Sequence, residues 1–328
     1  MAVRRSAQFY VGVDIGGSKI LAGLFSASLQ LRGTLKIKTK AKLGKEAVIG
    51  RVERVIRDLL SEQSVHLKQV RAIGLGAPGV VIKGRVINAY NIGWDNVPIK
   101  TILQRRIRLP VFVENDCNLF TFGIHRVELE GKPRTMIGCF LGTGFGGGVI
   151  INGELHTGFN HAAGEFGQMA IDKDGIKTAH SFRGSLESLA SRTGIVRRLR
   201  RAVLEGETTL LTGELGSQLK GIRSRHLRMA LTKKDPLMIR VIRNVSEDCG
   251  VGVAGLISAF GPECVVLGGG VIEALGKTML PIIRKTAEAH VLPGTLRGIK
   301  MIASKMGDDG GIYGAALHAQ EGLSNSKR

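Results

Sequence analysis

The chain has 328 residues, of which 43% are hydrophobic and 23% are charged, and this composition excludes the disordered and fibrous classes of protein. Its four cysteines include no CxxC pair, so they indicate no disulfide framework, and we expect the chain in the reducing cytoplasm. The nearest candidate for a membrane span, residues 249–271, is interrupted by Pro262 and Glu263. This stretch predicts a buried helix followed by a buried strand, and the basic N-terminus lacks the apolar stretch of a secretory signal.

The formal net charge of +20 allows two interpretations. Basic residues are densest in residues 192–245, where Arg197, Arg198, Arg200 and Arg201 are interleaved with apolar positions at the spacing of an amphipathic helix. Such a cluster is either a solvated helix face or a surface that binds a polyanion. We see no helix-turn-helix or zinc-finger pattern, and the first motif starts by residue 11, which leaves no room before it for a DNA-reading domain. We therefore expect no nucleic-acid partner.

The first half of the chain has the pattern of an α/β unit. Residues 9–13 are typical of a buried strand, Gly16 and Gly17 predict a tight turn, and residues 20–25 predict the returning strand. Apolar residues at helical spacing predict an amphipathic helix over 44–63. Further strands are expected at residues 31–37, 70–75 and 111–113.

The second half of the chain repeats this order. A strand is expected at 136–141, followed by the glycine-rich stretch GTGFGGG and a returning strand at 149–151. A later strand at 264–267 runs into GGG. Helices are expected around residues 186–203, 236–258, 273–289 and 310–320. The repeat predicts two duplicated α/β lobes with a cleft between them, and ligand sites beyond the carboxyl ends of their strands.

The first glycine turn combines a carboxylate with a backbone that can approach an anion. Its residues are Asp14, Gly16, Gly17, Ser18 and Lys19. Glycine N–H groups can point at a phosphate because no Cβ blocks them. Asp14 is suited to hold Mg²⁺ through water, since this cation prefers oxygen ligands and keeps several waters. Taken alone, the segment is equally compatible with an ordinary hairpin turn.

The second glycine-rich stretch, residues 142–148, contains five glycines in seven residues. We interpret it as a second phosphate cradle in which Thr143 donates its hydroxyl and Gly144 opens the backbone. The alternative is a flexible loop or a crowded turn.

Two further segments carry candidate carboxylates. Asp116, after Asn115 at a strand end, is placed to accept a proton from a sugar hydroxyl, although an isolated Asn-Asp pair can equally form an Asx-turn. Glu165 and Glu187 could grip vicinal sugar hydroxyls, although solvated surface carboxylates are the alternative for both.

Taken together, these motifs resemble the ROK family of the sugar-kinase, Hsp70 and actin superfamily. The similarity runs from about residue 10 to 318 and rests on DIGGSKI, ENDCN, LGTGFGGGVIINGEL, GEFGQMAID, CVVLGGGV and GDDGGIYGAA. The resemblance implies an α/β, two-lobed, ribonuclease H-like fold with a cleft between the lobes. The implied division is a smaller lobe over residues 1–117, closed by the C-terminal helix at about 310–328, and a larger lobe over 118–309.

The resemblance also implies roles for individual residues. Asp116 matches the catalytic base of the family, and Asn115, Glu165 and Glu187 match its sugar contacts. Gly79 and Asn91 fall near the expected sugar pocket. The phosphate loops are matched by Gly16, Gly17, Ser18, Lys19, Thr143 and Gly144, and the nucleoside side by Gly269 and Gly270.

One window departs from the family pattern. Where the family carries CxCGxxGCxE and an upstream histidine that bind a structural zinc, residues 178–187 contain no cysteine and the histidine position is Gln168. No thiolate remains for a tetrahedral zinc site, so we predict a zinc-free member. His156, His161 and His180 are the alternative ligands if a metal binds elsewhere. Because the missing histidine also contacts sugar in the family, Gln168 leaves the identity of the sugar open.

The resemblance predicts an ATP-dependent hexose kinase that uses Mg²⁺ and phosphorylates the 6-hydroxyl of the sugar. NIGWDNVPI is most similar to the glucokinase members, so glucose is the first candidate, ahead of N-acetylmannosamine, fructose, mannose and allose. The alternatives are a non-catalytic sugar-binding regulator of the family, and a kinase that draws on inorganic polyphosphate. Family resemblance favours a homodimer.

Overall fold

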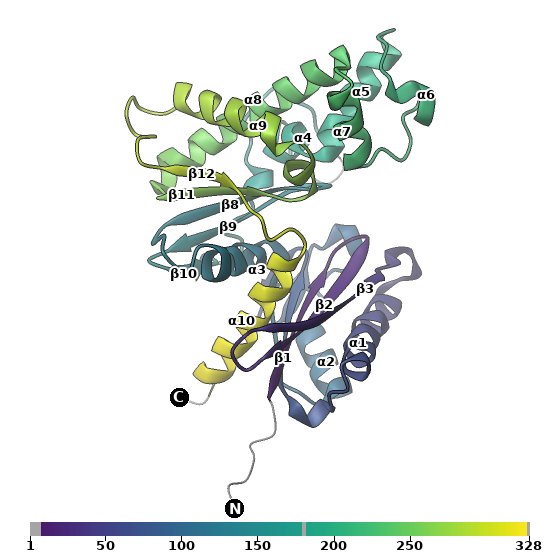
Figure 1. Ribbon diagram of the computed structural model, residues 1–328, viewed down its shortest axis with the longest axis vertical. Coiled ribbons are helices and arrows are strands. Elements are labelled where there is room, and N and C mark those ends of the chain that lie inside the picture. Colours follow the sequence, from purple (N-terminus) through teal and green to yellow (C-terminus); the bar gives the residue numbers. More distant parts are fainter. Residues whose placement is uncertain (1–7, 179–181, 327–328) are drawn as a thin grey trace, which may run out of the picture. The chain divides into compact units, whose positions relative to one another are not determined.

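The computed structural model describes residues 8–178 and 182–326 (Figure 1). The chain forms two compact units, one comprising Met1–Lys132, Leu155–Ala163 and Asp308–Arg328, the other Pro133–Glu154 and Gly164–Gly307. The boundary that we expect at residue 117 falls inside a helix of the first unit, α3, and as a division between folding domains it stays a prediction. None of the helices in the described ranges combines the length and apolar character that a membrane crossing requires.

The first unit is built on a five-stranded sheet with the order β3-β2-β1-β4-β7. Its strands are β1 (Phe9–Ile15), β2 (Lys19–Ser26), β3 (Leu31–Lys38), β4 (Val70–Ala77) and β7 (Val111–Asn115). Strands β1, β2 and β3 form an antiparallel meander, and β4 and β7 run parallel to β1. A short hairpin of β5 (Val80–Ile82) and β6 (Arg85–Ile87) follows β4.

Helices cover both faces of this sheet because successive side chains of a strand point to opposite faces. Val11, Val13 and Ile15 of β1 pack in one core with α1 (Lys45–Glu62) and α2 (Ile99–Ile107), whereas Tyr10 packs in another with α10 (Asp309–Asn325). Figure 1 shows α10 and α1 on opposite sides of β1. The remaining helical segments are η1 (Ala41–Leu43), η2 (Leu67–Gln69), η3 (Tyr90–Ile92), α3 (Asp116–Gly123) and η4 (Ile124–Glu128).

Helix α10 lies unusually close to the strands and to α3, and glycines make this approach possible. A Cβ built on Gly74 of β4 would lie 1.7 Å from the carbonyl oxygen of Ala315, and one on Gly314 would lie 1.8 Å from that of Leu119 in α3. Both distances are far below any real contact, so any larger side chain would push the helix away. The close packing fixes α10, and therefore its first turn, against the carboxyl end of the parallel strands.

The second unit repeats the strand order of the first, with a sheet in the order β10-β9-β8-β11-β12. Its strands are β8 (Met136–Leu141), β9 (Phe145–Ile151), β10 (Glu154–His156), β11 (Cys264–Gly268) and β12 (Lys300–Ala303). Of β10, only Glu154 falls in the second unit by the division given above. Strands β8 and β9 are antiparallel, and β11 is parallel to both β8 and β12. The shared strand order confirms the expected duplication and the α/β fold class.

Helices pack against the sheet of the second unit around one large apolar core. They are η5 (Phe166–Gln168), α4 (Leu186–Ala190), α5 (Arg192–Leu204), α6 (Leu211–Leu215), α7 (Ser224–Thr232), α8 (Pro236–Phe260) and α9 (Gly270–Ala289). The apolar stretch at 249–271 is the end of α8 followed by β11, which confirms a buried helix and strand.

Two expectations about local structure in this unit are wrong. The single helix expected over 186–203 is two helices, because Ser191 is extended and its hydroxyl accepts the N–H of Gly194 at 3.1 Å, which caps α5. The glycine-rich stretch is mostly strand: β9 begins at Phe145, so the turn holds only residues 142–144. Glycine at 147 has a packing reason, since a Cβ there would lie 2.2 Å from the ring of Phe166.

The packing of α10 can be tested by adding one methyl group. Gly74→Ala places a Cβ against the backbone of α10, and we expect the free energy of unfolding to fall by about 3 kcal/mol or more. Gly50→Ala is the matched control, because it lies inside α1 with no atom within 4 Å of the added Cβ. It should raise the stability by about 0.5 to 1 kcal/mol. Urea unfolding measures both, and equal stability of the two variants would contradict the close packing.

Candidate active site

The carboxyl ends of three parallel strands bring two aspartates together in the first unit. In the register of the sheet, Asp14 of β1 lies beside Gly76 of β4, and Asp116 follows β7 as the first residue of α3. A Cβ on Gly76 would lie 3.4 Å from the Cα of Asp116 and 3.5 Å from Oδ1 of Asp14. Glycine at position 76 therefore leaves the space between the two aspartates open.

The surroundings of Asp14 disfavour the ionised form of its carboxyl group. Burial, the negative charge of Asp116 and, more weakly, that of Asp308 raise the pKa of Asp14 to about 7, and Lys19 opposes the shift. The first turn of α10 closes over it, since a Cβ on Gly311 would lie 3.2 Å from Cγ of Asp14. A partly buried carboxylate pair of this kind favours either a proton or a divalent cation.

Asp116 and its neighbours form a hydrogen-bonded group at the start of α3. The carboxylate of Asp116 accepts the N–H of Cys117 at 2.9 Å, and burial raises the pKa of Asp116. Asn115 caps the helix by accepting the N–H of Asn118 at 3.0 Å, and its amide donates to the carbonyl of Gly79 at 3.0 Å. The capping role of Asn115 agrees with the Asx-type alternative, while Asp116 remains at the strand edge.

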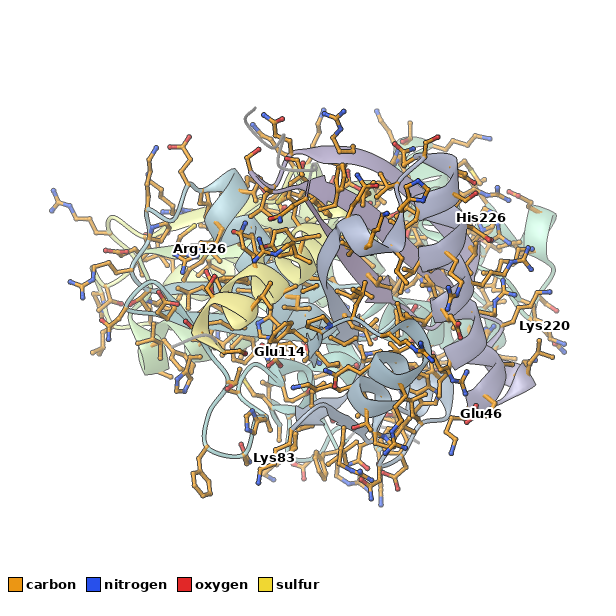
Figure 2. The ribbon with its side chains drawn as sticks, turned by 90° about the horizontal axis from the view of Figure 1, so that it is seen from below. Glu46, Lys83, Glu114, Arg126, Lys220 and His226 are labelled. Carbon is orange, nitrogen blue, oxygen red and sulfur yellow. The ribbon has the colours of Figure 1, made fainter. Side chains whose placement is uncertain are left out.

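Glu114, the residue before Asn115, is hydrogen-bonded to this group and was not anticipated from the sequence. Glu114, labelled in Figure 2, is 7% exposed. Its carboxylate accepts the N–H of Asn115 at 2.8 Å and the side-chain amide of Asn118 at 3.1 Å. Burial raises the pKa of Glu114. The available signal was a carboxylate directly after the apolar run of residues 111–113 in the same strand, which is unusual for a buried position.

The first glycine turn connects β1 to β2 as a hairpin. The N–H of Gly16 donates to the carbonyl of Lys19 at 2.9 Å, and Thr39 donates its hydroxyl to the carbonyl of Gly16 at 2.6 Å. Gly17 and Ser18 are exposed. Asn91 lies against the turn, since a Cβ on Gly17 would lie 3.4 Å from that of Asn91. The structure thus brings together Asp14, Gly16, Gly17, Ser18, Lys19, Gly79, Asn91, Asn115 and Asp116 within one unit.

Lys19, which ends this turn, and Lys36 of the neighbouring strand β3 share one carboxylate partner. Lys19 and Lys36 both form ion pairs with Asp308, which immediately precedes α10. These contacts lower the pKa of Asp308 despite its partial burial. Asp308 therefore links the turn to α10, and neither Lys36 nor Asp308 was singled out from the sequence.

In the second unit, the turn of residues 142–144 is held by the start of α5. The backbone N–H of Arg192 donates to the carbonyl of Gly142 at 3.0 Å, and the hydroxyl of Thr193 donates to the carbonyl of Thr143 at 2.7 Å. The guanidinium of Arg192 donates to the hydroxyl oxygen of Thr143 at 2.6 Å. An arginine in direct contact with the second glycine turn was not foreseen.

Glu187 of α4 contacts the same turn. Its carboxylate accepts the N–H of Phe145 at 2.9 Å, and a Cβ on Gly144 would lie 2.2 Å from its Oε2. Glu165 and Gln168 are nearby in sequence around η5, and a Cβ on Gly167 would lie 3.3 Å from that of Glu187. The side-chain oxygen of Gln168 is buried and accepts no hydrogen bond from the described residues. The structure therefore gathers the η5 segment with Glu187, and their roles as sugar contacts stay predictions.

The glycines after β11 reach the same edge of the second sheet. Gly269 has a φ of 83°, and a Cβ on it would lie 2.7 Å from the carbonyl oxygen of Leu141, the last residue of β8. Gly270 begins α9, and a Cβ on it would lie 3.6 Å from the hydroxyl of Ser224 in α7. Because β8 and β11 are parallel neighbours, the turn at Gly269 and the turn at Thr143 lie together.

The window that replaces the cysteine motif contains ordinary structural contacts where it is described. Ser185 caps α4 by accepting the N–H of Ser188 at 3.2 Å, and Arg183 donates to the carbonyl of Gly175 at 3.0 Å. Residues 8–178 and 182–326 contain no cluster of three His, Cys, Asp or Glu side chains arranged for a metal. His180 lies outside the described residues, and the absence of zinc stays a prediction.

Comparisons with known proteins give one consistent result. Residues 10–321 match the model of the ROK family. The chain is 31% identical over 313 residues to a glucokinase of Halalkalibacterium halodurans, with 94% of each chain covered. It is 32% identical over 316 residues to a glucokinase of Streptomyces coelicolor, with 95% of this chain and 97% of that one covered. The crystal structure of a ROK family glucokinase from Streptomyces griseus, in complex with glucose and AMPPNP, is similar with a TM-score of 0.84 at 30% identity, covering 95% and 99% of the two chains.

The raised pKa of Asp14 predicts that the effect of this residue on stability depends on pH. Its pKa is 3.8 ordinarily and about 7 in the folded protein, so the ionised carboxylate costs stability progressively between these values and fully above them. With metals removed by a chelator, we expect Asp14→Asn to raise the free energy of unfolding at pH 8 by about 1 to 2 kcal/mol, allowing for solvent screening. The gain should shrink at pH 5, where the folded wild-type protein is already protonated at this site. Asp58→Asn, on the exposed face of α1, is the control, and a gain independent of pH would contradict the assignment.

Proposed function

Because the chain belongs to the ROK family, we propose that it is an ATP-dependent glucokinase that transfers the terminal phosphoryl group of ATP to the 6-hydroxyl of glucose. The proposal is supported by the two glucokinases that share about a third of its residues over nearly their whole length. It is also supported by the similar fold of a glucokinase that binds glucose and AMPPNP.

The observation that carries the proposal is the position of Asp116. Its carboxylate stands at the carboxyl edge of the parallel strands, where such folds bind ligands. Burial raises its pKa, which makes it a better proton acceptor than a solvated aspartate. In the proposed reaction Asp116 orients the 6-hydroxyl and takes its proton as the oxygen attacks phosphorus, and the leaving ADP carries the electron pair of the broken P–O bond.

The sugar would be held by amide and carboxylate groups. Asn115, with Gly79 behind it, lies beside Asp116 in the first unit. In the second unit Gln168 offers a buried side-chain oxygen that accepts no hydrogen bond from the described residues, and a sugar hydroxyl is a suitable donor for it. Glu165 and Glu187 supply further acceptors in this proposal. Kinases for N-acetylmannosamine or fructose would use the same groups, so the choice of sugar is a matter for measurement.

We propose a phosphate contact for each glycine turn, and the aspartates beside the first turn also fit a magnesium ion. Burial, and after it the negative charge of Asp116, raises the pKa of Asp14 to about 7, and a divalent cation would relieve the repulsion between the two carboxylates. Asp14 would hold the ion through water. When bound, magnesium would neutralise charge on the phosphates, while Lys19 and the N–H group of Gly17 would orient them. The N–H of Gly16 is held by the carbonyl of Lys19, so Gly16 would contribute the close approach of its backbone.

The wider setting follows from family resemblance. We propose that the enzyme is cytoplasmic, that its product enters glycolysis, and that it works as a homodimer without a nucleic-acid partner. The alternative of a non-catalytic regulator is disfavoured by the presence of both glycine turns and of a carboxylate at position 116.

The proposed base can be tested by removing its charge while keeping its shape. We expect Asp116→Asn to lower kcat for glucose phosphorylation by about 10² to 10⁴, since general base catalysis contributes this much. Binding of glucose, measured by calorimetry, should change little because the amide preserves the size of the side chain. ADP release in a coupled assay across a panel of hexoses measures both the activity and the sugar preference of the wild-type protein.

A matched variant separates this effect from a general loss of charge. Asp174→Asn removes an exposed carboxylate and should leave kcat unchanged. If the wild-type protein released no sugar-dependent ADP, or if Asp116→Asn retained near-normal turnover, the proposed function would be wrong.

A further inference from the structure

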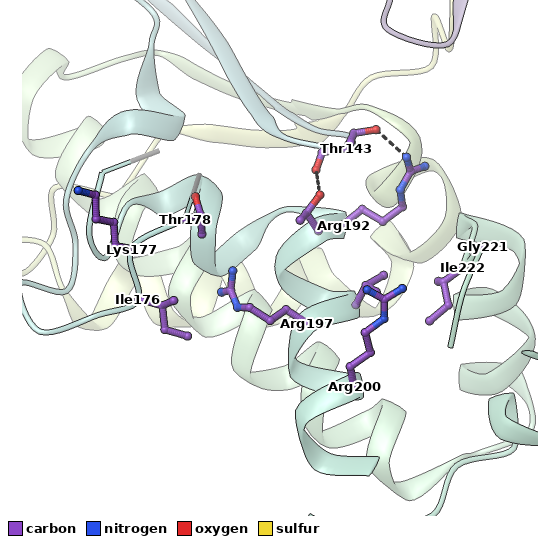
Figure 3. Close-up of a pocket in the computed structure, with 11 residues that line it drawn as sticks. Thr143, Ile176, Lys177, Thr178, Arg192, Arg197, Arg200, Gly221 and Ile222 are labelled. Carbon is purple, nitrogen blue, oxygen red and sulfur yellow. Dashed lines mark hydrogen bonds between the residues drawn. The ribbon is translucent and has the colours of Figure 1, made fainter. Parts of the chain in front are cut away.

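A basic cavity adjoins the second glycine turn. It has a volume of about 570 Å³ and lies within the second unit (Figure 3). Four of its lining side chains are cationic: Lys177, Arg192, Arg197 and Arg200. None of the described residues that line it carries a carboxylate. A cavity lined in this way attracts anions and repels cations.

The arginines of the cavity differ from their neighbours on the same helix. Arg198 and Arg201 of α5 form ion pairs with Asp248 and Glu205. By contrast, Arg197 and Arg200 donate hydrogen bonds to neutral groups, the carbonyls of Ser188 and Leu219 respectively. The Nε of Arg197 is buried and has no hydrogen-bond partner among the described residues. Within the described part of the chain, no carboxylate pairs with these two guanidinium groups, so their charge is available to an incoming anion.

Helical periodicity explains why these side chains share one cavity. Thr193, Val196, Arg197 and Arg200 are spaced three, four and seven residues along α5, so they lie on one face. In Figure 3, Arg197 extends toward Ile176 and Thr178, whereas Arg200 extends toward Ile222. Because Arg192 and Arg200 are two turns apart on the helix, about 12 Å, a single phosphate is too small to meet all three arginines. An extended anion with several charges along its length fits this arrangement.

The cavity is continuous with the proposed phosphate site through one residue. Thr143 belongs to the turn of residues 142–144 and also lines the cavity. Its hydroxyl oxygen accepts a hydrogen bond from the guanidinium of Arg192, with 2.6 Å between oxygen and nitrogen. A chain of phosphates that begins at this turn therefore meets Arg192 first and Arg197 and Arg200 farther in.

From this arrangement we propose that Arg192, Arg197 and Arg200 form a subsite for the phosphoanhydride chain of the phosphoryl donor. The inference rests on the proposed kinase function. Planar guanidinium groups bind phosphate oxygens in pairs, which suits a chain that presents two non-bridging oxygens at each internal phosphorus and three at its free end. The same chemistry occurs in a nucleoside triphosphate and in inorganic polyphosphate, and the experiment separates these two sources. With either donor, the terminal P–O anhydride bond breaks, a bond to the sugar oxygen forms, and the donor leaves one phosphate shorter.

The test compares two double variants with equal loss of charge. Arg197→Gln with Arg200→Gln removes two cations of the cavity, whereas Arg201→Gln with Arg240→Gln removes two exposed cations elsewhere in the same unit. Calorimetry measures the Kd of inorganic tripolyphosphate, and coupled assays measure KM for ATP and for sodium polyphosphate as sole donors. We expect the cavity variant to raise the Kd of tripolyphosphate at least tenfold, since each lost contact is charge-assisted. The control should change it less than twofold.

The changes in KM show which of the two phosphoryl donors occupies the subsite. A matching rise in KM for ATP identifies the nucleotide phosphates as the occupant, and a rise confined to polyphosphate identifies the inorganic chain. If the cavity variant and the control bind tripolyphosphate equally, the subsite is wrong. Arg200→Gln alone, at an exposed position, serves as a second variant if the double substitution impairs folding. Because calorimetry needs no turnover, a protein that binds tripolyphosphate through these arginines but phosphorylates no sugar would overturn the proposed function and leave the subsite standing.

Discussion

The close contact between helix α10 and the central strands of the first unit is the constraint on which the candidate active site depends. Gly74 and Gly314 let backbone meet backbone at these points, and side chains larger than hydrogen at either position would meet a carbonyl oxygen. Packing of this kind leaves α10 little freedom to shift, because protein interiors are close-packed and relax only slightly. As a result, Gly311 in the first turn of the helix is held over Asp14, and Asp308 just before the helix is held within reach of Lys19.

This packing has an electrostatic consequence at the strand ends. Desolvation by the surrounding elements, α10 among them, and the proximity of Asp116 keep Asp14 in an environment that resists ionisation. Glu114 and Asp116 are likewise buried enough for their pKa values to rise. Burial of three carboxyl groups along one edge of the sheet lowers the stability of the protein when no ligand is bound. Their placement is understandable if the edge is shaped for a proton acceptor and for a cation that accompanies phosphates, as it is in the proposed glucokinase.

Much of this arrangement could be predicted from the sequence, because the decisive motifs are local. Asp14 and the glycines after it follow an apolar strand directly, so both the turn and its place at a strand end are visible in the order of residues. The break at Ser191 was missed because apolar spacing continues across it, and only the extended backbone and the capping hydroxyl separate the two helices. Asp308 and Arg192 were missed for another reason: their partners are Lys19 and Thr143, and these pairings join segments that come together only when the sheets and helices are assembled. Glu114 pairs locally with Asn118, so its signal was present in the sequence.

The proposed reaction depends on Asp116 as the group that receives the proton of the sugar hydroxyl. The most direct measurement is a crystal structure of the protein with glucose and a non-hydrolysable ATP analogue. If Asp116 is the base, the 6-hydroxyl oxygen lies within hydrogen-bond reach of its carboxylate, at about 2.6 to 3.2 Å. A sugar whose 6-hydroxyl contacts a different carboxylate, with Asp116 bonded only to its own helix, would contradict this role.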